Sequence, residues 1–157
     1  GTTAIQANDL VGRKTARDGG QSARAIAEQI AKTEADLHAS GTAAALSMAR
    51  HLQTAREAFL QTVDFVAGKA KASPNAVYAG SVPYLMLAGN LVAGWQMGRA
   101  LLVAQDKLAA GEEAAFMQAK IITAQFYAEH ILTRVPGLAH TVCTGGESAC
   151  ALPLEAF

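Results

Sequence analysis

Apolar residues recur every three or four positions over most of the chain, which is the spacing that gathers them on one face of an α-helix. The first such stripe lies within residues 18–41, with Glu34 as its one polar exception. Asp18 and Gln21 resemble the start of a capped helix, and a serine–glycine pair at the end of the stretch supplies a stop. The pattern therefore predicts one amphipathic helix over this segment.

A second and longer stripe predicts a helix over residues 42–70, or about eight turns. Charged and amide side chains largely fill the opposite face of this helix, so its apolar stripe should face the core. The expected core positions are Ala45, Met48, Leu52, Ala55, Phe59, Val63 and Val66.

Proline and glycine residues delimit two further helical segments. The third helix should begin at Pro74, because proline is favoured at the first helical position. Pro83 removes a backbone donor and crowds the turn before it, so we expect a kink or a break near Ser81. The fourth helix lies within residues 112–137 and should close or bend at its proline–glycine end.

Four helices of this length, joined by short turns, favour an all-α fold in the form of an antiparallel up-down four-helix bundle. We expect the bundle domain to comprise residues 18–157. Residues 1–17 show no helical periodicity and are expected to form an irregular N-terminal arm. Residues 138–157 contain a Gly-Gly break and are expected to form an irregular C-terminal tail.

The composition narrows the possible functions. Apolar residues make up 51% of the 157 positions and charged residues 17%, which excludes a disordered chain. Thirteen basic residues balance thirteen acidic ones, so the chain offers no net field to attract nucleic acid or an anionic membrane. The apolar excess indicates that part of the bundle surface binds another subunit or domain.

The most apolar window, residues 85–104, is long enough to cross a bilayer and holds Gly94 and Gly98 in a G-x-x-x-G pattern. Arg99 argues against a membrane span, because an arginine near the bilayer centre costs about 2.5–3.5 kcal/mol on insertion scales. We therefore expect a buried helix whose glycines admit close neighbours. Trp95, beside these glycines, is expected to serve in packing.

Few side chains suggest chemistry. Cys143 and Cys150 are expected as thiols in a reducing, cytoplasmic setting, since no N-terminal stretch has the features of a secretory leader. With His140 they supply only three of the four ligands of a structural zinc site, so we expect no metal. Glu129 and His130 diverge by about 100° on a helix and should not act as an acid–base pair. The residues alone indicate no active site.

Short blocks of the sequence nevertheless resemble a known family. The first six residues, "GTTAIQ", resemble the second half of E-G-T-x-x-I-Q, the segment that carries the catalytic glutamate of acyl-CoA dehydrogenases. Four later blocks resemble the C-terminal region of larger bacterial members that carry an extra helical domain, a subgroup that includes enzymes similar to methylmercaptopropionyl-CoA dehydrogenases. These blocks are "DLVGRKTARDGG", "YLMLAGNLVAGW", "AKIITAQFYAEHILTRVPGL" and "ALPLEAF". The resemblance extends over essentially the whole chain.

The resemblance implies a parent flavoenzyme in which a glutamate removes the α-proton of an acyl-CoA thioester while the β-hydride passes to FAD. That glutamate is expected immediately before Gly1, so this chain should hold no catalytic residue. By the same resemblance, Gly1 would approach the thioester, Thr2 would contact the flavin, and Arg13 would approach the coenzyme A portion of the substrate.

The chain is then expected to be the C-terminal domain of an FAD-dependent acyl-CoA dehydrogenase, which oxidises acyl-CoA to 2,3-enoyl-CoA and passes electrons to an acceptor. Residues 1–17 would be the remnant of the active-site segment. Alone, the chain should bind no FAD, be inactive, and have a structural role against the rest of the parent chain and homo-oligomer subunits. Two alternatives stay open, a stand-alone helical interaction module and a membrane-associated domain.

Overall fold

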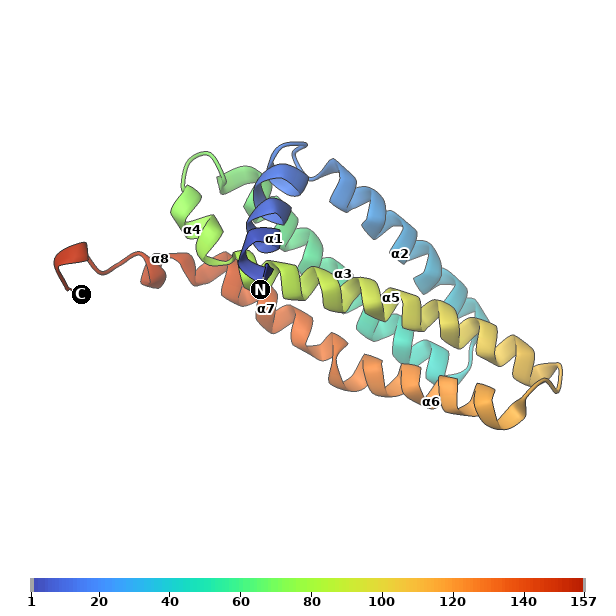
Figure 1. Ribbon diagram of the computed structural model, residues 1–157. Helices are drawn as coiled ribbons and strands as arrows, with labels where there is room; N and C mark the ends of the chain where they lie inside the picture. Colours follow the sequence, from blue (N-terminus) through green and yellow to red (C-terminus); the bar gives the residue numbers. More distant parts are fainter. Residues whose placement is uncertain (1, 157) are drawn as a thin grey trace.

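The computed structural model of the protein describes residues 2–156, and every regular element in this range is helical (Figure 1). The all-α class predicted from the sequence is confirmed. The α-helices are α1 (Thr3–Asp9), α2 (Gln21–Ser40), α3 (Ala43–Lys69), α4 (Pro74–Ala79), α5 (Ser81–Ala109), α6 (Ala114–His130), α7 (Val135–Thr144) and α8 (Gly146–Ala149). Three further helical segments are the π-helix η1 (Leu10–Ala16) and the 3-10 turns η2 (Leu132–Arg134) and η3 (Leu154–Ala156).

Helices α2, α3, α5 and the α6–α7 segment lie side by side along the long axis of the molecule (Figure 1). Helix α3 contacts α2 on one side and α5, α6 and α7 on the other, and α5 packs along α6. Helices α6 and α7 nearly continue one another through the short turn η2. The core therefore lies around α3 and the inner faces of α5 and α6.

The stripe predicted for the second helix is confirmed, since all seven of its expected core positions are buried on α3. Two glycines end helices in the left-handed conformation, Gly41 after α2 with φ of 67° and Gly111 after α5 with φ of 78°. The Thr42 hydroxyl caps α3 by accepting a hydrogen bond from the Ala45 amide at 3.2 Å. These ends match the sequence signals for helix stops and starts.

The break expected near Ser81 is present, because α4 ends at Ala79 and α5 begins at Ser81. Restarting the helix there places Pro83 in a first turn, where its missing amide hydrogen has no intrahelical acceptor to lose. Gly80 also lies against α7, since a Cβ atom on it would stand 3.0 Å from the Val142 Cα. Sterics and local backbone chemistry thus favour the same break.

The expectation of an irregular N-terminal arm is wrong, because residues 3–16 are helical throughout. The arm contacts α5, α3 and α2 and buries Ala7, Val11 and Thr15. These three residues are spaced by four, so they face the core together along one side of a helix. Tertiary burial stabilises a helix here although the stripe is short.

The expected irregular C-terminal tail is also wrong over most of its length. The chain bends at Ile131–Arg134 rather than at the Pro136-Gly137 pair, and Pro136 lies in the first turn of α7. Helix α7 continues to Thr144, and α8 follows directly. Only the segment after α8 extends away from the bundle (Figure 1).

The glycines of α5 admit close neighbours, as predicted. A Cβ atom on Gly94 would stand 2.5 Å from the Leu132 Cδ2, and one on Gly98 would stand 3.2 Å from the Leu37 Cδ1. Trp95 is half-buried and donates a hydrogen bond from Nε1 to the Thr33 hydroxyl at 2.8 Å. No helix within residues 2–156 combines the length and apolarity that a membrane crossing requires.

Candidate functional site

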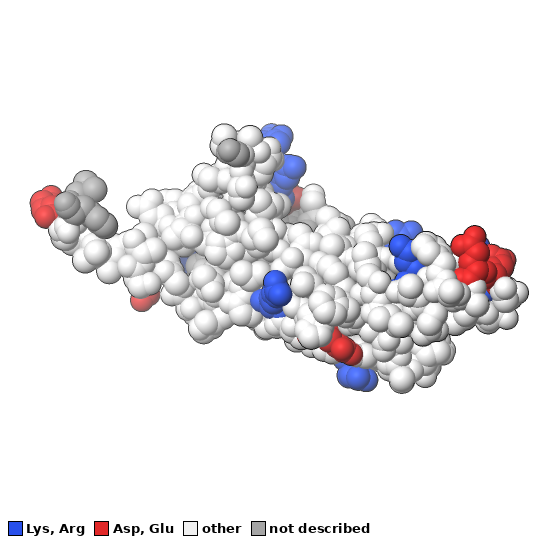
Figure 2. All heavy atoms as spheres, turned by 60° about the horizontal axis from the view of Figure 1, so that its bottom comes forward, with Lys and Arg blue, Asp and Glu red and all other residues white. Residues whose placement is uncertain are grey.

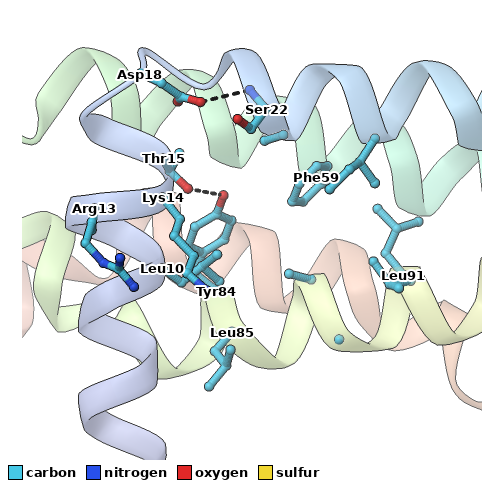
Figure 3. A pocket seen from close by; sticks show the side chains of 15 residues that line it. Leu10, Arg13, Lys14, Thr15, Asp18, Ser22, Phe59, Tyr84, Leu85 and Leu91 are labelled. Carbon is cyan, nitrogen blue, oxygen red and sulfur yellow. Dashed lines mark hydrogen bonds between the residues drawn. The ribbon is translucent and has the colours of Figure 1, made fainter.

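An apolar groove lies where the N-terminal arm meets α2, α3 and α5 (Figure 3). Its volume is about 570 Å³. The apolar lining residues are Leu10, Ala23, Ile26, Phe59, Leu85, Ala88, Leu91 and Val92, and the polar ones include Arg13, Lys14, Thr15, Asp18, Ser22 and Tyr84. A groove of this size and lining can hold a flexible apolar group or a few packed side chains.

A buried pair of hydroxyl groups fastens the arm to α5 beside this groove. The Thr15 Oγ1 and the Tyr84 hydroxyl oxygen lie 3.0 Å apart, and both residues are 1% exposed. The Tyr84 ring also stacks against Phe59 of α3, with ring centroids 6.2 Å apart. Burial raises the pKa of Tyr84, while the hydrogen bond with Thr15 opposes that rise. Tyr84 therefore stays neutral at pH 7 and serves as a hydrogen-bonding group rather than as a base.

The rim of the groove carries an ion pair on the arm. Arg13 donates hydrogen bonds from Nε and Nη2 to the two carboxylate oxygens of Asp9, at 2.6 and 2.9 Å. The hydrogen bond from Arg13 lowers the pKa of Asp9, and the same pairing raises the pKa of Arg13. Lys14 stands 3.9 Å from the same carboxylate. Two cations thus share one anion at this edge.

Asp18 closes the turn between the arm and α2. Its carboxylate accepts hydrogen bonds from the backbone amides of Gly20 at 2.9 Å and Ser22 at 3.0 Å. Hydrogen bonding to the Ser22 side chain, followed by its backbone amide, lowers the pKa of Asp18. Asp18 therefore supports the start of α2, as the sequence suggested, but it does so from two residues before the N-cap Gly20.

The π-helical stretch from Leu10 to Ala16 is the least common backbone feature of this region. Hydrogen bonds from the Arg17 amide to the Gly12 carbonyl and from the Gly20 amide to the Thr15 carbonyl span five residues. Gly12 lies against α4, because a Cβ atom on it would stand 2.5 Å from the Tyr78 hydroxyl. Such π-helical stretches are rare and are frequently found at functional sites.

The residues that the family resemblance singled out do not converge on one site. Gly1 lies outside the described residues. Thr2 is exposed before α1 and does not line the groove, whereas Arg13 is exposed on its rim. Their separation of eleven residues along helical backbone corresponds to roughly 16 Å. Sequence reasoning missed the groove and the Thr15–Tyr84 pair, because both depend on contacts between distant segments; the four-residue spacing of the arm's buried positions was a signal only for a helical arm.

The remaining candidate chemistry is sparse. Both cysteines are free thiols, as predicted, and burial raises the pKa of Cys143, which disfavours a reactive thiolate. Within residues 2–156, no three His, Cys, Asp or Glu side chains gather where they could hold a metal ion. His130 stacks on Phe126 with centroids 4.4 Å apart. Within the part of the chain that the structure describes, His130 therefore packs against a residue of its own helix.

Comparison with known proteins identifies the family. Residues 25–153, which run from α2 to beyond α8, match the family described as acetyl-CoA dehydrogenase C-terminal like. This chain belongs to that family. The acyl-CoA dehydrogenase resemblance of the sequence blocks is thereby confirmed.

Two curated acyl-CoA dehydrogenases are similar to this family member. It is 49% identical over 148 residues to 3-methylmercaptopropionyl-CoA dehydrogenase from Ruegeria pomeroyi, a match that covers 94% of this chain and 25% of the relative. It is 34% identical to broad-specificity linear acyl-CoA dehydrogenase FadE5 from Mycobacterium tuberculosis, over 84% of this chain and 23% of the relative. The chain therefore spans about a quarter of the length of these relatives. The α3 and α5 walls of the groove and Ile26 of α2 lie inside the family match, whereas Ser22, Ala23 and the arm precede it.

Proposed function

We propose that this chain is the C-terminal helical domain of an FAD-dependent acyl-CoA dehydrogenase whose parent oxidises acyl-CoA to 2,3-enoyl-CoA. The observation that carries this proposal is the 49% identity to a dehydrogenase four times as long. In the proposal, α2, α3, α5 and the α6–α7 segment form an antiparallel up-down bundle domain over residues 18–157. Residues 1–17 continue from the active-site segment of the parent, and the protein is cytoplasmic.

In the proposal, this domain does not bind the flavin by itself. Thr2, the residue with a proposed flavin contact, is exposed and does not line the groove beside Tyr84. The groove beside Tyr84 is mainly apolar and supplies no set of donors for a pyrophosphate. In the proposal, the rest of the parent binds FAD and carries the catalytic glutamate, and the isolated chain is inactive.

The proposed role of this domain is structural. The arm leads from the bundle toward the rest of the parent, and the groove that it borders is apolar with a charged rim. Residues from the rest of the parent chain would cover this groove, with Arg13 turned toward the coenzyme A portion of the substrate, Thr2 toward the flavin and Gly1 toward the thioester. Homo-oligomer subunits are the second proposed partner, and the parent passes its electrons to an acceptor.

An alternative function is a stand-alone interaction module. Its support is the number of large apolar side chains that α5 and α6 expose, among them Met86, Val103, Phe116 and Phe126. Such surfaces favour a partner of any origin and do not require a parent flavoenzyme.

The coding sequence upstream of Gly1 tests which function applies. Our proposal predicts a reading frame that continues for several hundred codons, with a glutamate codon directly before the codon of Gly1. An initiator methionine at this position, or any other residue there, would remove the active-site assignment of the arm and leave the interaction module.

A further inference from the structure

The hairpin of α5 and α6 carries a second groove, which lies at the opposite end of the bundle from the C-terminal segment (Figure 1). Its volume is about 450 Å³. The lining residues are Gln96, Arg99, Ala100, Val103, Ala104, Lys107, Phe116, Met117 and Lys120. Val103 is 55% exposed and Phe116 is 53% exposed, so two large apolar side chains stand at the centre of this surface in contact with water.

Basic residues flank this apolar centre on the side toward the middle of the bundle. Lys120 Nζ lies 5.0 Å from the Phe116 ring centroid, and the Arg99 guanidinium lies 5.7 Å from the Trp95 ring. Arg99 also donates a hydrogen bond to the Gln96 side-chain oxygen at 2.9 Å. Neither cation forms an ion pair with a carboxylate among residues 2–156.

Acidic residues flank the same centre on the side toward the hairpin turn. Glu113 lies in the turn with a φ of 42°, and Asp106 is exposed on α5. Glu112 is already paired with Lys107 at 2.6 Å. In Figure 2, acidic side chains gather at the right-hand end of a largely uncharged face, with basic side chains next to them.

The spacing of these charges is regular. Asp106 follows Arg99 by seven residues along α5, and Glu113, the N-cap residue of α6, stands seven residues before Lys120. Seven residues are close to two helical turns, or about 10 Å, so Asp106 lies on the same flank of α5 as Arg99, while Glu113 lies at the turn end of α6. Phe116 and Val103 lie between the acidic and basic ends.

We propose that this surface, defined by Arg99, Val103, Asp106, Glu113, Phe116 and Lys120, binds a second copy of the chain about a two-fold axis near Phe116 and Val103. A two-fold axis at this point turns the acidic end of one copy onto the basic end of the other, and the reverse. The Phe116 ring of each copy is then placed at the groove of its partner. The complementary occupant is therefore the same surface, since one face already carries both halves of the charge pattern.

This inference rests on the proposed function, in which homo-oligomer subunits are a partner, and it names the surface that they share. Charge reversal and rescue on the complete 157-residue chain test it. The variants are Lys120→Glu, Glu113→Lys and the double variant, with Lys32→Glu and Glu28→Lys on the exposed side of α2 as a matched control pair. Sedimentation equilibrium measures the dimer dissociation constant, and thermal unfolding followed by circular dichroism verifies the fold of each variant.

Each single reversal places two repulsive contacts in the symmetric dimer, so it should raise the dissociation constant at least about tenfold. The double variant should return to within about threefold of the wild type, because its attractive pairs are restored in the opposite sense. The α2 control variants should leave the dissociation constant unchanged. Higher salt should weaken the wild-type dimer.

A wild-type chain that stays monomeric at about 100 µM would overturn the inference, and so would a double variant as weak as the sum of its single changes. Either result would leave the dehydrogenase role in place, because that role depends on the parent reading frame and on flavin. Conversely, flavin binding by this chain alone would contradict the proposed function without altering the measured dimer.

Discussion

Arg56 of α3 donates two hydrogen bonds to the carboxylate of Glu34 on α2, at 2.8 Å from Nε and 2.9 Å from Nη2. The Glu34 side chain is 8% exposed and that of Arg56 18% exposed. The polar exception in the first apolar stripe therefore has a partner on the neighbouring helix. This geometry raises the pKa of Arg56, chiefly through its hydrogen bonds to Glu34.

Removal of Arg56 should destabilise the fold, because it leaves the buried Glu34 carboxylate without its partner. We expect Arg56→Ala to lower the free energy of unfolding by about 2–3 kcal/mol, measured by urea denaturation. The double variant Glu34→Leu with Arg56→Leu should lose less than about 1 kcal/mol, because apolar residues of similar volume replace the pair. Equal losses in the single and double variants would show that the lost packing of Arg56, and not the stranded charge, sets the cost.

The hydroxyl pair of Thr15 and Tyr84 should limit stability at alkaline pH. Burial raises the pKa of Tyr84, so its contribution is complete below the usual tyrosine pKa of about 10 and is lost as the pH rises above that value. Tyr84→Phe should cost about 1 kcal/mol at pH 7, since it leaves the Thr15 hydroxyl without its partner. In Tyr84→Phe the loss of stability above pH 10 should be smaller than in the wild type, as measured by urea denaturation at several pH values.

Adding Thr15→Val to Tyr84→Phe serves as the control, because it removes the stranded hydroxyl and should recover part of the loss at pH 7. If Tyr84→Phe loses as much stability above pH 10 as the wild type does, another group titrates in that pH range.

Replacing each of two glycines on α5 by alanine should change the stability of the chain in opposite directions. Gly94→Ala places a Cβ atom 2.5 Å from the buried Leu132 side chain, and the overpacking cost of about 1–3 kcal/mol should exceed the helix-propensity gain of about 1 kcal/mol. Gly89→Ala meets no atom within 4 Å and should stabilise the chain by about 0.5–1 kcal/mol. Thermal unfolding of the two variants decides this, and stabilisation by both would contradict the close approach of α5 to Leu132.

Stability at acidic pH should depend in part on Asp18. Its pKa is lowered in the folded chain, chiefly by hydrogen bonding to Ser22, so its contribution is present above the unfolded pKa of about 3.9 and is lost as the pH falls through the folded value. Asp18→Asn should therefore be less stable than the wild type at pH 7 and approach it below pH of about 3. A constant difference between pH 7 and pH 2 in urea denaturation would argue against this capping role.

Long apolar stripes made much of the fold predictable. The seven core positions of α3 repeat over several turns, and the left-handed glycines after α2 and α5 follow local rules of helix termination. Pro83 likewise signalled the break before α5, because the steric effect of proline is local. These features depend on near neighbours along the chain, so the sequence alone carries them.

The arm and the groove were not predictable in the same way. The arm is helical because Ala7, Val11 and Thr15 meet side chains from α3 and α5, including Tyr84, which is 69 residues from Thr15. A helical stripe of three residues is too short to stabilise a helix by itself, so tertiary contacts stabilise the arm. The two exposed positions on the arm with predicted ligand roles, Thr2 and Arg13, were accessible only through resemblance to the family.

We propose that this domain works only as part of a larger flavoenzyme, and one comparison tests this dependence most directly. The full-length product of the reading frame and the 157-residue chain are each incubated with FAD, freed of unbound flavin, and scanned for visible flavin absorbance. Reduction of an artificial electron acceptor with acyl-CoA is then followed for both. We predict bound flavin and turnover for the full-length protein and neither for the chain alone; flavin or turnover in the chain alone, or neither in the full-length protein, would contradict the account.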